Sequence, residues 1–440
     1  MSLKPPLMVG KLQTVLRAQA KESPKYRFYS LYDKVYRADV LLHAFNRCKA
    51  NGGSAGVDGQ TFDNIESYGV DRWLGELAEK LRTRKYRPDA VRRVWIPKGD
   101  GGRRPLGIPT ICDRVVQMAV VLVVEPIFDL DLQPEQHAYR TDHNAHQALR
   151  EVQCWLDRGY TEVVDADLSG YFDSIPHHEL MKCVARRISD GTLLHLFKMW
   201  LEMPVVETDE RGHEHRTTRN KDEGRGTPQG AVVSPLLANL YMRRFVRAWR
   251  VLGHERRLDA HIVNYADDFV ICCPPGVAEK AMAVMRGMMD SLRLMVNERK
   301  TRTCALPEES FTFLGFTFER QVSWRTGHVY IGSKVSKNKV SSICDRIGEA
   351  SSRRTLRGSQ TEVVRRLNEL LLGWGNYFCM GNVAGAWRVV QNHACRRLRQ
   401  WLWRKCGESG SVRGYPNMKL YEEYGLVNLS ACVRHISAWA

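Results

Sequence analysis

Two short apolar runs flank a pair of adjacent carboxylates in the segment His261-Ile-Val-Asn-Tyr-Ala-Asp-Asp-Phe-Val-Ile271. This pattern predicts two strands joined by a tight turn that carries Asp267 and Asp268. Two acids at the tip of an apolar hairpin repel each other, and a divalent cation would remove that cost. Mg²⁺ prefers oxygen ligands and is commonly held by one or two carboxylates together with substrate phosphates. A solvated Asp-Asp turn explains the same residues about equally well.

A second apolar run that ends in acidic residues supports the metal interpretation. It reads Val163-Val-Asp-Ala-Asp-Leu-Ser-Gly-Tyr-Phe-Asp173. If this strand pairs beside the hairpin, Asp167 meets Asp267 and Asp268 at one end of the same sheet. Three carboxylates placed there can hold two Mg²⁺ ions roughly 4 Å apart, which activates a 3′-hydroxyl and stabilises a departing pyrophosphate. Capping and turn formation before a helix that follows Pro176 is the competing explanation of these acids.

The balance of charge favours a polyanionic partner. The chain has 66 lysines and arginines against 49 aspartates and glutamates, which gives a formal net charge of +17. Such a surplus suits nucleic acid or an anionic membrane surface. The longest apolar stretch, Val115 to Val124, is about half as long as a membrane-spanning helix, so we expect nucleic acid and no membrane. The first residues contain no hydrophobic signal core, and the twelve cysteines form no CxxC pair, so we expect a cytosolic protein.

Residue patterns along the chain predict an α+β protein with a helical C-terminal part. A chain of 440 residues is expected to form two or three sub-domains. Strands are predicted at 90–96, 161–168, 261–265, 269–273 and 311–318. Helices are predicted at 110–125, 144–158, 177–190, 233–250 and 278–292. After about residue 330, apolar residues at helical spacing are surrounded by arginines, which predicts an all-helical, strongly basic domain.

Taken in order, these motifs resemble the reverse transcriptases of bacterial group II introns. Tyr265-Ala-Asp-Asp268 is similar to the signature box of that family, and Asp167 followed by Phe172 is similar to its first catalytic strand. Further similar segments are Ile108-Pro-Thr110, Asp113-Arg114, Gly226 to Asn239, Leu294 to Thr301 and Phe313-Leu-Gly-Phe316. Trp374-Gly-Asn-Tyr-Phe378 and the basic stretches around it resemble the maturase, or thumb, domain. The chain is therefore identified as a member of the group II intron-encoded reverse transcriptase and maturase family, in the group that lacks an endonuclease domain.

The resemblance implies an α+β right-hand polymerase. Its fingers and palm would consist of an antiparallel sheet plus helices, followed by an α-helical thumb or maturase domain. The implied boundaries are 1–60 for an N-terminal extension and template-loop block, 61–160 for fingers, 161–325 for palm, and 326–440 for thumb. A fingers-type segment interleaved in the palm is compatible with this division.

The resemblance also implies a role for each matching residue. Asp167 and Asp267 would be the main metal ligands, with Asp268 beside them, for two Mg²⁺ ions that Mn²⁺ can replace. Phe172 would be a steric gate that excludes the 2′-hydroxyl of a ribonucleotide, although ordinary core packing also explains an aromatic ring there. The remaining implied substrate-binding residues are Lys98 and Arg104 for the triphosphate and Gln229 for the nucleotide and template pocket.

The implied partners are an RNA template, a DNA or RNA primer, dNTPs and a structured group II intron RNA. The implied activity is RNA-directed DNA synthesis on a primer 3′-hydroxyl, with maturase activity in intron splicing and mobility. We expect a location in the bacterial cytoplasm, with nucleoid association when the protein acts on DNA. The residues assigned to nucleic-acid binding are Arg140, Asn239, Lys300, Arg365, Arg366, Arg396 and Arg397.

One segment departs from the family pattern and keeps other functions open. Where the family usually has a stretch of the type Gly-Phe-Arg-Pro-Gly-Arg-Ser, this chain reads His137-Ala-Tyr-Arg-Thr-Asp-His-Asn-Ala-His146, so only Arg140 remains of the two arginines. A related enzyme domesticated for phage defence, CRISPR adaptation or DNA repair is the first alternative. A splicing factor that binds RNA without polymerising is the second, and the intact carboxylates argue against it. Phe172 argues against a polymerase that makes RNA.

Overall fold

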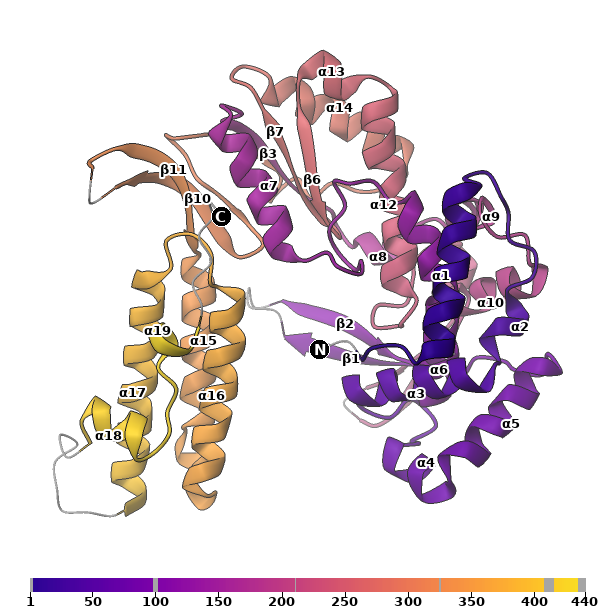
Figure 1. Cartoon of the computed structure of the whole chain (residues 1–440), viewed down its shortest axis with the longest axis horizontal. Coiled ribbons are helices and arrows are strands. Elements are labelled where there is room, and N and C mark those ends of the chain that lie inside the picture. Colours follow the sequence, from indigo (N-terminus) through magenta and orange to yellow (C-terminus); the bar gives the residue numbers. More distant parts are fainter. Residues whose placement is uncertain (1–2, 98–101, 210, 324–325, 407–414, 434–440) are drawn as a thin grey trace. The chain divides into compact units, whose positions relative to one another are not determined.

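The computed structural model describes residues 3–97, 102–209, 211–323, 326–406 and 415–433. The chain divides into two compact units, and Figure 1 labels the helices and strands along it. Unit 1 comprises Met1–Asn144, Ala166–Phe269 and Lys280–Thr301, and unit 2 comprises Ala145–Asp165, Val270–Glu279 and Arg302–Ala440. The expected division into extension, fingers, palm and thumb remains a prediction. In the described ranges, no helix is both long enough and apolar enough to cross a membrane.

The N-terminal part of unit 1 is a group of helices built around α6 (Ile111–Phe128). This helix is apolar on nearly every face, which is typical of a helix buried in a core. Thr110 caps its first turn by accepting a hydrogen bond from the backbone N–H of Asp113 at 3.1 Å. The elements that pack against it are α1 (Leu7–Glu22), α2 (Tyr32–Val35), α3 (Ala38–Asn51) and the 3₁₀ turn η1 (Asp129–Asp131). Beyond them, α5 (Val70–Arg82) packs against α3 and against α4 (Phe62–Tyr68). The predicted helix at 110–125 is thereby confirmed.

A four-stranded sheet with the order β2-β1-β4-β5 belongs to the same unit. Its members are β1 (Val91–Pro97), β2 (Arg103–Ile108), β4 (Val205–Thr208) and β5 (Glu214–Thr217). β1 pairs antiparallel with β2, so that Ile96 lies opposite Arg104, and it pairs in parallel with β4. β4 and β5 escaped prediction because each has only four residues, and most side chains of β5 are exposed and polar.

The second sheet has the strand order β6-β7-β3-β8. It consists of β3 (Glu162–Asp167), β6 (His261–Tyr265), β7 (Asp268–Cys273) and β8 (Arg302–Ala305), and the boundary between the units passes through β3 and β7. The expectation that the strand ending in Asp167 lies beside the hairpin is confirmed, because β3 is the neighbour of β7. The helices along this part of the chain are α8 (Tyr171–Ser174), α9 (His177–Ala185), α10 (Gly191–Leu201), α11 (Arg219–Glu223), α12 (Ser234–Val251), α13 (His254–Leu258) and α14 (Ala278–Ser291).

The prediction of one helix over 177–190 was wrong at its end. α9 stops at Ala185, and α10 starts only after Asp190. The Asp190 carboxylate accepts hydrogen bonds from the backbone N–H groups of Thr192 and Leu193, both at 3.1 Å. An aspartate that caps a helix in this way favours a new start over continuation of the preceding helix.

Unit 2 contains a three-stranded sheet with the order β11-β10-β9. The strands are β9 (Phe311–Phe313), β10 (Phe316–Val322) and β11 (Val329–Val335), and α7 (Ala145–Asp157) packs against β11. The prediction of a single strand over 311–318 was wrong, because the chain reverses at Leu314-Gly315. Both residues have positive φ, 51° and 83°, which is the geometry of a two-residue hairpin turn.

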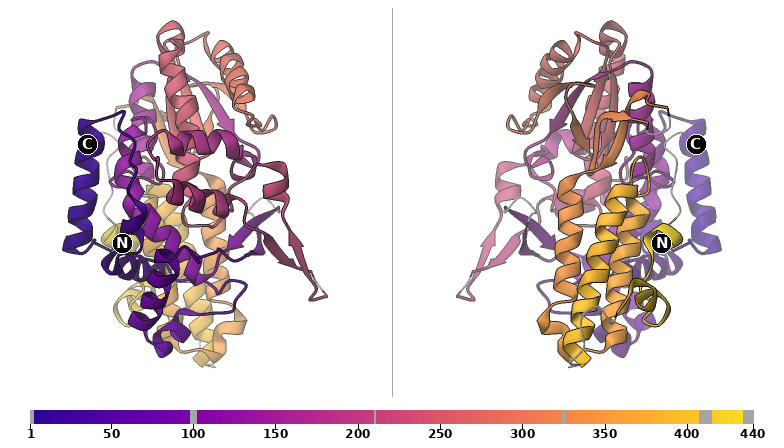
Figure 2. Two further views of the ribbon diagram at one scale, coloured as in Figure 1. Left: turned by 90° about the vertical axis from the view of Figure 1, so that its right-hand side faces the viewer. Right: turned by 90° about the vertical axis from the view of Figure 1, so that its left-hand side faces the viewer.

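The C-terminal part of unit 2 is a helical bundle. Its elements are α15 (Lys337–Ala350), the 3₁₀ segment η2 (Arg353–Arg357), α16 (Gln360–Tyr377), α17 (Ala384–Cys406), α18 (Asn417–Glu422) and α19 (Leu429–Cys432). Helices α15, α16 and α17 lie side by side in both views (Figures 1 and 2). The predicted apolar stripe is buried at Val363, Leu367 and Leu371. The first helix of this bundle begins at Lys337, directly after β11.

Candidate active site

The three predicted carboxylates lie at strand ends of the β6-β7-β3-β8 sheet. Asp167 is the last residue of β3, Asp267 lies in the turn between β6 and β7, and Asp268 is the first residue of β7. All three are half-buried. The turn is held by the buried Asn264 side chain, whose amide donates to the carbonyl of Ala266 at 2.8 Å. The sequence therefore fixes both the strands and the turn that present these acids.

Burial and neighbouring charges at the strand ends raise the pKa of Asp267. Burial raises the pKa of its carboxyl, and the negative charge of Asp167 adds to the rise, whereas Arg104 and Lys300 oppose it. Asp167 accepts a hydrogen bond from the Asn297 amide at 2.8 Å, and the ammonium of Lys300 lies 3.4 Å from the same oxygen. Two neighbouring carboxylates are thus kept in a setting that disfavours a second negative charge.

These carboxylates fit a divalent cation whose coordination is completed by a substrate. Within the described part of the chain, no group of three or more histidine, cysteine, aspartate or glutamate side chains is close enough to hold a metal ion alone. Mg²⁺ usually takes one or two carboxylates and fills its other positions with water and substrate phosphates. A cation beside Asp167 and Asp267 would also remove the repulsion that raises the pKa of Asp267.

A cavity of about 860 Å³ in unit 1 gathers three of the predicted substrate-binding residues. Arg104 comes from β2, Phe172 from α8 and Gln229 from the turn before α12. The Gln229 side chain accepts from Arg104 Nε at 3.3 Å and donates to Asp173 Oδ2 at 2.9 Å. Phe172 is 7% exposed, and its carbonyl accepts from the backbone N–H of Thr227 at 2.7 Å. The fourth predicted residue, Lys98, lies outside the described residues.

Glycine lets the Gln229 turn approach β2 closely. The backbone N–H of Gly107 in β2 donates to the carbonyl of Gln229 at 2.6 Å. Gly230 has a φ of +101°, and a Cβ atom added there would collide with the Gly107 carbonyl oxygen and with the Leu106 side chain. Only glycine fits this conformation and this approach without strain. The contact fixes the side of the cavity that carries Arg104 and Gln229.

Tyr139 is a residue of this cavity that the motifs did not reveal. Its side chain is 49% exposed and lines the cavity. Its φ of 54° lies in the left-handed region, which is uncommon for a large residue. Burial raises the pKa of its hydroxyl, and the nearby charge of Asp267 raises it further. The only sequence signal was the aromatic position in the atypical 137–146 segment.

Two residues assigned to nucleic-acid binding form hydrogen bonds that support the segment carrying Tyr139. Arg140 donates from Nε to Asp129 Oδ1 at 2.9 Å and from Nη1 to the carbonyls of Gln133 and Gln136, both at 2.9 Å. Asn239 is 1% exposed and donates to the carbonyl of Ala138. Their surroundings indicate a structural role, and contact with nucleic acid remains a prediction for both.

The basic residues predicted in the C-terminal helices have different surroundings. Arg365 pairs with Glu362 at 2.7 Å and with Glu369. Arg397 donates to the carbonyl of Gly348 at 2.8 Å and so ties α17 to α15. Arg396 is exposed near His393 at 3.1 Å, and Arg366 is exposed on α16. Arg365 and Arg397 are therefore engaged in contacts within the protein, whereas Arg366 and Arg396 are exposed to solvent.

Residues 96–318, which include all three carboxylates and most of the cavity lining, match the family described as reverse transcriptase (RNA-dependent DNA polymerase). This chain belongs to the reverse transcriptase family. Residues 340–415, which cover most of α15 and all of α16 and α17, match the group II intron maturase-specific domain. The chain thus joins a reverse transcriptase domain to a maturase domain, as the sequence motifs predicted.

Similar proteins include both bacterial and organellar members of the family. Protein YkfC of Escherichia coli is 31% identical over 76% of this chain and 94% of its own length. The group II intron-encoded protein LtrA of Lactococcus lactis is 30% identical over 49% of this chain and 34% of its own length. Nuclear intron maturase 2 of Arabidopsis thaliana is 29% identical over 25% of this chain and 15% of its own length. This reverse transcriptase therefore spans nearly all of YkfC but only about a third of LtrA.

Proposed function

We propose that the chain is an RNA-directed DNA polymerase that extends a primer 3′-hydroxyl with dNTPs and also binds a group II intron RNA as a maturase. The observation that carries the first part is the meeting of Asp167 and Asp267 at neighbouring strand ends, in the same unit as a cavity lined by Arg104, Phe172 and Gln229. The match of residues 340–415 to a maturase-specific domain supports the second part.

The carboxylates of Asp167, Asp267 and Asp268 are the residues that would hold two Mg²⁺ ions. When bound, such ions activate the 3′-hydroxyl and stabilise the charge on the departing pyrophosphate. Arg104 lies on the cavity side of β2, where its guanidinium can bind the triphosphate, and Gln229 orients it through their hydrogen bond. The Phe172 ring, fixed by the contact of its backbone with Thr227, would occupy the place of a 2′-hydroxyl and select dNTPs.

Primer extension on a defined RNA template tests this proposal. Purified protein is assayed with Mg²⁺ and with dNTPs or rNTPs in parallel, and Asp267→Ala serves as the control. We expect extension with dNTPs that is lost in the variant, because the metal site loses a ligand while phosphate contacts continue to dominate RNA affinity. Absence of extension, together with tight and salt-sensitive RNA binding, would favour a maturase that folds RNA without copying it.

A domesticated enzyme is the second candidate, and the segment 137–146 is the observation that favours it. In this segment Asp142 has a positive φ of 62°, and the His143 ring packs 5.7 Å from the His137 ring. A splicing assay on the RNA that surrounds the reading frame separates the two candidates. Splicing that depends on the protein supports the intron role, whereas polymerase activity with no dependent splicing supports domestication.

A further inference from the structure

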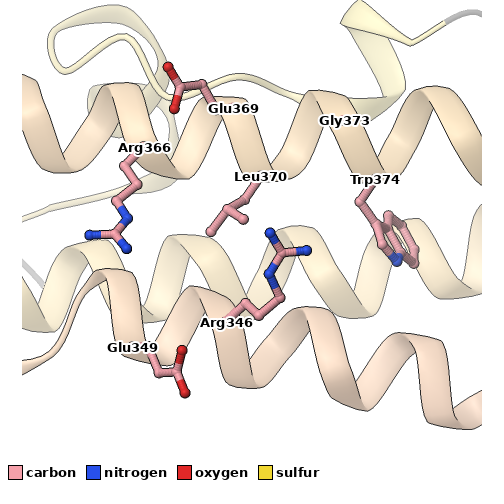
Figure 3. Close-up of a pocket in the computed structure, with 7 residues that line it drawn as sticks. All are labelled: Arg346, Glu349, Arg366, Glu369, Leu370, Gly373 and Trp374. Carbon is pink, nitrogen blue, oxygen red and sulfur yellow. The ribbon is translucent and has the colours of Figure 1, made fainter. Parts of the chain in front are cut away.

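A groove of about 450 Å³ lies between α15 and α16 in unit 2 (Figure 3). Its walls include Arg346 from α15 and Arg366 from α16, with Leu370 between them and Trp374 at one end. None of these side chains belongs to the polymerase site described above. The groove therefore needs an explanation of its own.

The two arginines point into the groove from opposite walls (Figure 3). Among the residues that the structure describes, neither side chain forms a hydrogen bond or an ion pair. Arg365, one residue away, is in contrast fully engaged by Glu362 and Glu369. Two facing guanidinium groups repel each other, and an anion between them would turn that repulsion into charge-assisted hydrogen bonds.

Trp374 supplies an independent sign that the groove accepts a ligand. Its side chain is only 9% exposed, and its indole N–H has no hydrogen-bond partner within the described ranges. The ring is held in place by Phe378, with 5.1 Å between the ring centroids. Most buried polar groups in proteins are hydrogen-bonded, so an unpaired N–H beside a cavity indicates a missing acceptor.

Two glutamates at the groove limit where an anion can bind. Glu349 and Glu369 also line the groove, but their carboxylates point away from its centre, in opposite directions (Figure 3). Glu369 is further occupied by Arg365. A phosphate is therefore attracted to the space between Arg346 and Arg366 and repelled from the outer edges.

We propose that this groove binds a single unpaired nucleotide of an RNA. The phosphate lies between Arg346 and Arg366, and the base or sugar lies against Leu370 and accepts the indole N–H of Trp374. A volume of about 450 Å³ suits a small ligand, since such pockets span roughly 300–1,000 Å³, and it excludes a duplex. Unpaired bases that stack on aromatic rings and arginine planes are the usual targets of selective RNA recognition. The inference rests on the proposed function in that the maturase domain meets RNA.

The experiment compares two RNA hairpins of equal length and charge, one fully paired and one with a single bulged nucleotide. Binding to the full-length protein is measured by fluorescence anisotropy. The wild type should bind the bulged hairpin roughly tenfold more tightly, which corresponds to one good contact. The double variant Arg346→Gln/Arg366→Gln should lose this ratio. The single variant Arg366→Gln should also lower this ratio, and Arg365→Gln is its matched control, because it removes one positive charge from the same helix. Any affinity lost in Arg365→Gln should be the same for both hairpins, so that the ratio stays unchanged.

Further arms separate the sources of the signal. Trp374→Phe keeps the ring and removes only the N–H, so it should lower the ratio without unfolding the bundle. Inorganic phosphate and 5′-AMP are added as competitors, and competition by 5′-AMP alone supports recognition of a nucleotide. Equal losses for both hairpins in Arg366→Gln and Arg365→Gln would overturn the proposal, because they indicate general attraction. Primer extension by the wild type is measured in parallel, so a protein that discriminates bulges without extending primers contradicts the polymerase and not the groove.

Discussion

Tyr139 is held at the edge of the cavity by hydrogen bonds on both sides of it in the chain. The segment before it pairs with β6 through the N–H of His137, which donates to the carbonyl of Asn264 at 3.0 Å. Arg140 fixes the other side through Asp129. Between these anchors the Tyr139 side chain reaches the cavity in a left-handed conformation that costs about 1–3 kcal/mol. Such a cost is tolerated where the surroundings impose it, and it often accompanies function.

We therefore expect Tyr139→Ala to impair nucleotide use more than Tyr139→Phe. Loss of the ring should raise the KM for dNTPs by roughly tenfold, which corresponds to about 1.4 kcal/mol of lost contact. The phenylalanine variant keeps the ring and should lose much less. Steady-state primer extension with varied dNTP concentration measures both. A fall in kcat with unchanged KM in the alanine variant would argue against contact with the nucleotide.

Asp113 makes the stability of α6 depend on pH. Its carboxylate is 1% exposed and accepts hydrogen bonds from Tyr86 at 2.6 Å and Thr110 at 2.8 Å. Burial raises its pKa from 3.8 to about 6. Above that pKa the carboxyl is ionised in both the folded and the unfolded state, so its contribution to stability does not change with pH. Between about pH 4 and pH 6 the folded state takes up a proton that the unfolded state does not. Asp113 therefore stabilises the fold increasingly as the pH falls through this window.

Comparison with Asp113→Asn isolates this effect, since asparagine does not titrate. The free energy of opening of α6 in the wild type, relative to the variant, should rise by about 2 kcal/mol between pH 7 and about pH 4.5. Hydrogen exchange of the α6 amides measures the opening free energy at both pH values. A difference that stays constant with pH would show that Asp113 keeps an ordinary pKa.

The residues of the candidate site differ in how far the sequence could reveal them. The placement of Asp167, Asp267 and Asp268 at neighbouring strand ends was predictable, because each of these acids borders an apolar run that reads as a strand. Asn239 was not, because its partner, the carbonyl of Ala138, lies 101 residues away along the chain. A motif shows which residues of a family take part in its chemistry. Whether a polar residue instead supports the fold depends on hydrogen-bond partners in distant segments, which a motif does not show.

At the scale of elements, the contact between β2 and the Gln229 turn sets the shape of the cavity. Gly230→Ala would place a methyl group against the Gly107 carbonyl at a φ that alanine tolerates poorly. We expect a loss of about 1–3 kcal/mol of stability, as for other overpacked sites, and a rise of at least several-fold in the KM for dNTPs. Thermal unfolding and primer extension measure these effects. Gly159→Ala is a suitable control, because its φ is also positive at 94° but its Cβ meets open space. Equal effects of the two substitutions would show that backbone strain alone is responsible.

Helices and strands were predictable where a long run of apolar residues marks them. They were not predictable where a tight turn or a distant partner strand determines the local structure. The helix at 110–125 followed from its continuous apolar character. The strand predicted at 311–318 failed because its alternation continues through the hairpin, while Leu314-Gly315 reverses the chain and pairs Phe313 with Phe316. β4 pairs with β1 on one side and with β5 on the other. A local sequence pattern does not predict its pairing with β1, because the two strands are more than 100 residues apart in the chain.

At the scale of the whole molecule, the carboxylates proposed to be catalytic lie in unit 1 and the groove arginines lie in unit 2. This division predicts that synthesis and RNA recognition can be lost separately. Asp267→Ala should abolish primer extension and leave RNA affinity nearly unchanged, because affinity comes mainly from phosphate contacts. Arg346→Gln/Arg366→Gln should weaken RNA binding and reduce the slope of log affinity against log salt by about 1, because the two arginines contact one phosphate. Its kcat at saturating primer and template should stay near that of the wild type.

Measuring salt-dependent binding and single-turnover extension on the same preparations of both variants tests this separation. Arg365→Gln again serves as the control for charge, since its guanidinium is committed to Glu362 and Glu369. If extension and RNA binding decline together in both variants, the two units act as one site, and the groove contributes to polymerisation itself. If each variant loses only one of the two activities, the carboxylates and the groove act independently on the same RNA. The carboxylates then serve to copy the strand, and the groove recognises its unpaired nucleotides.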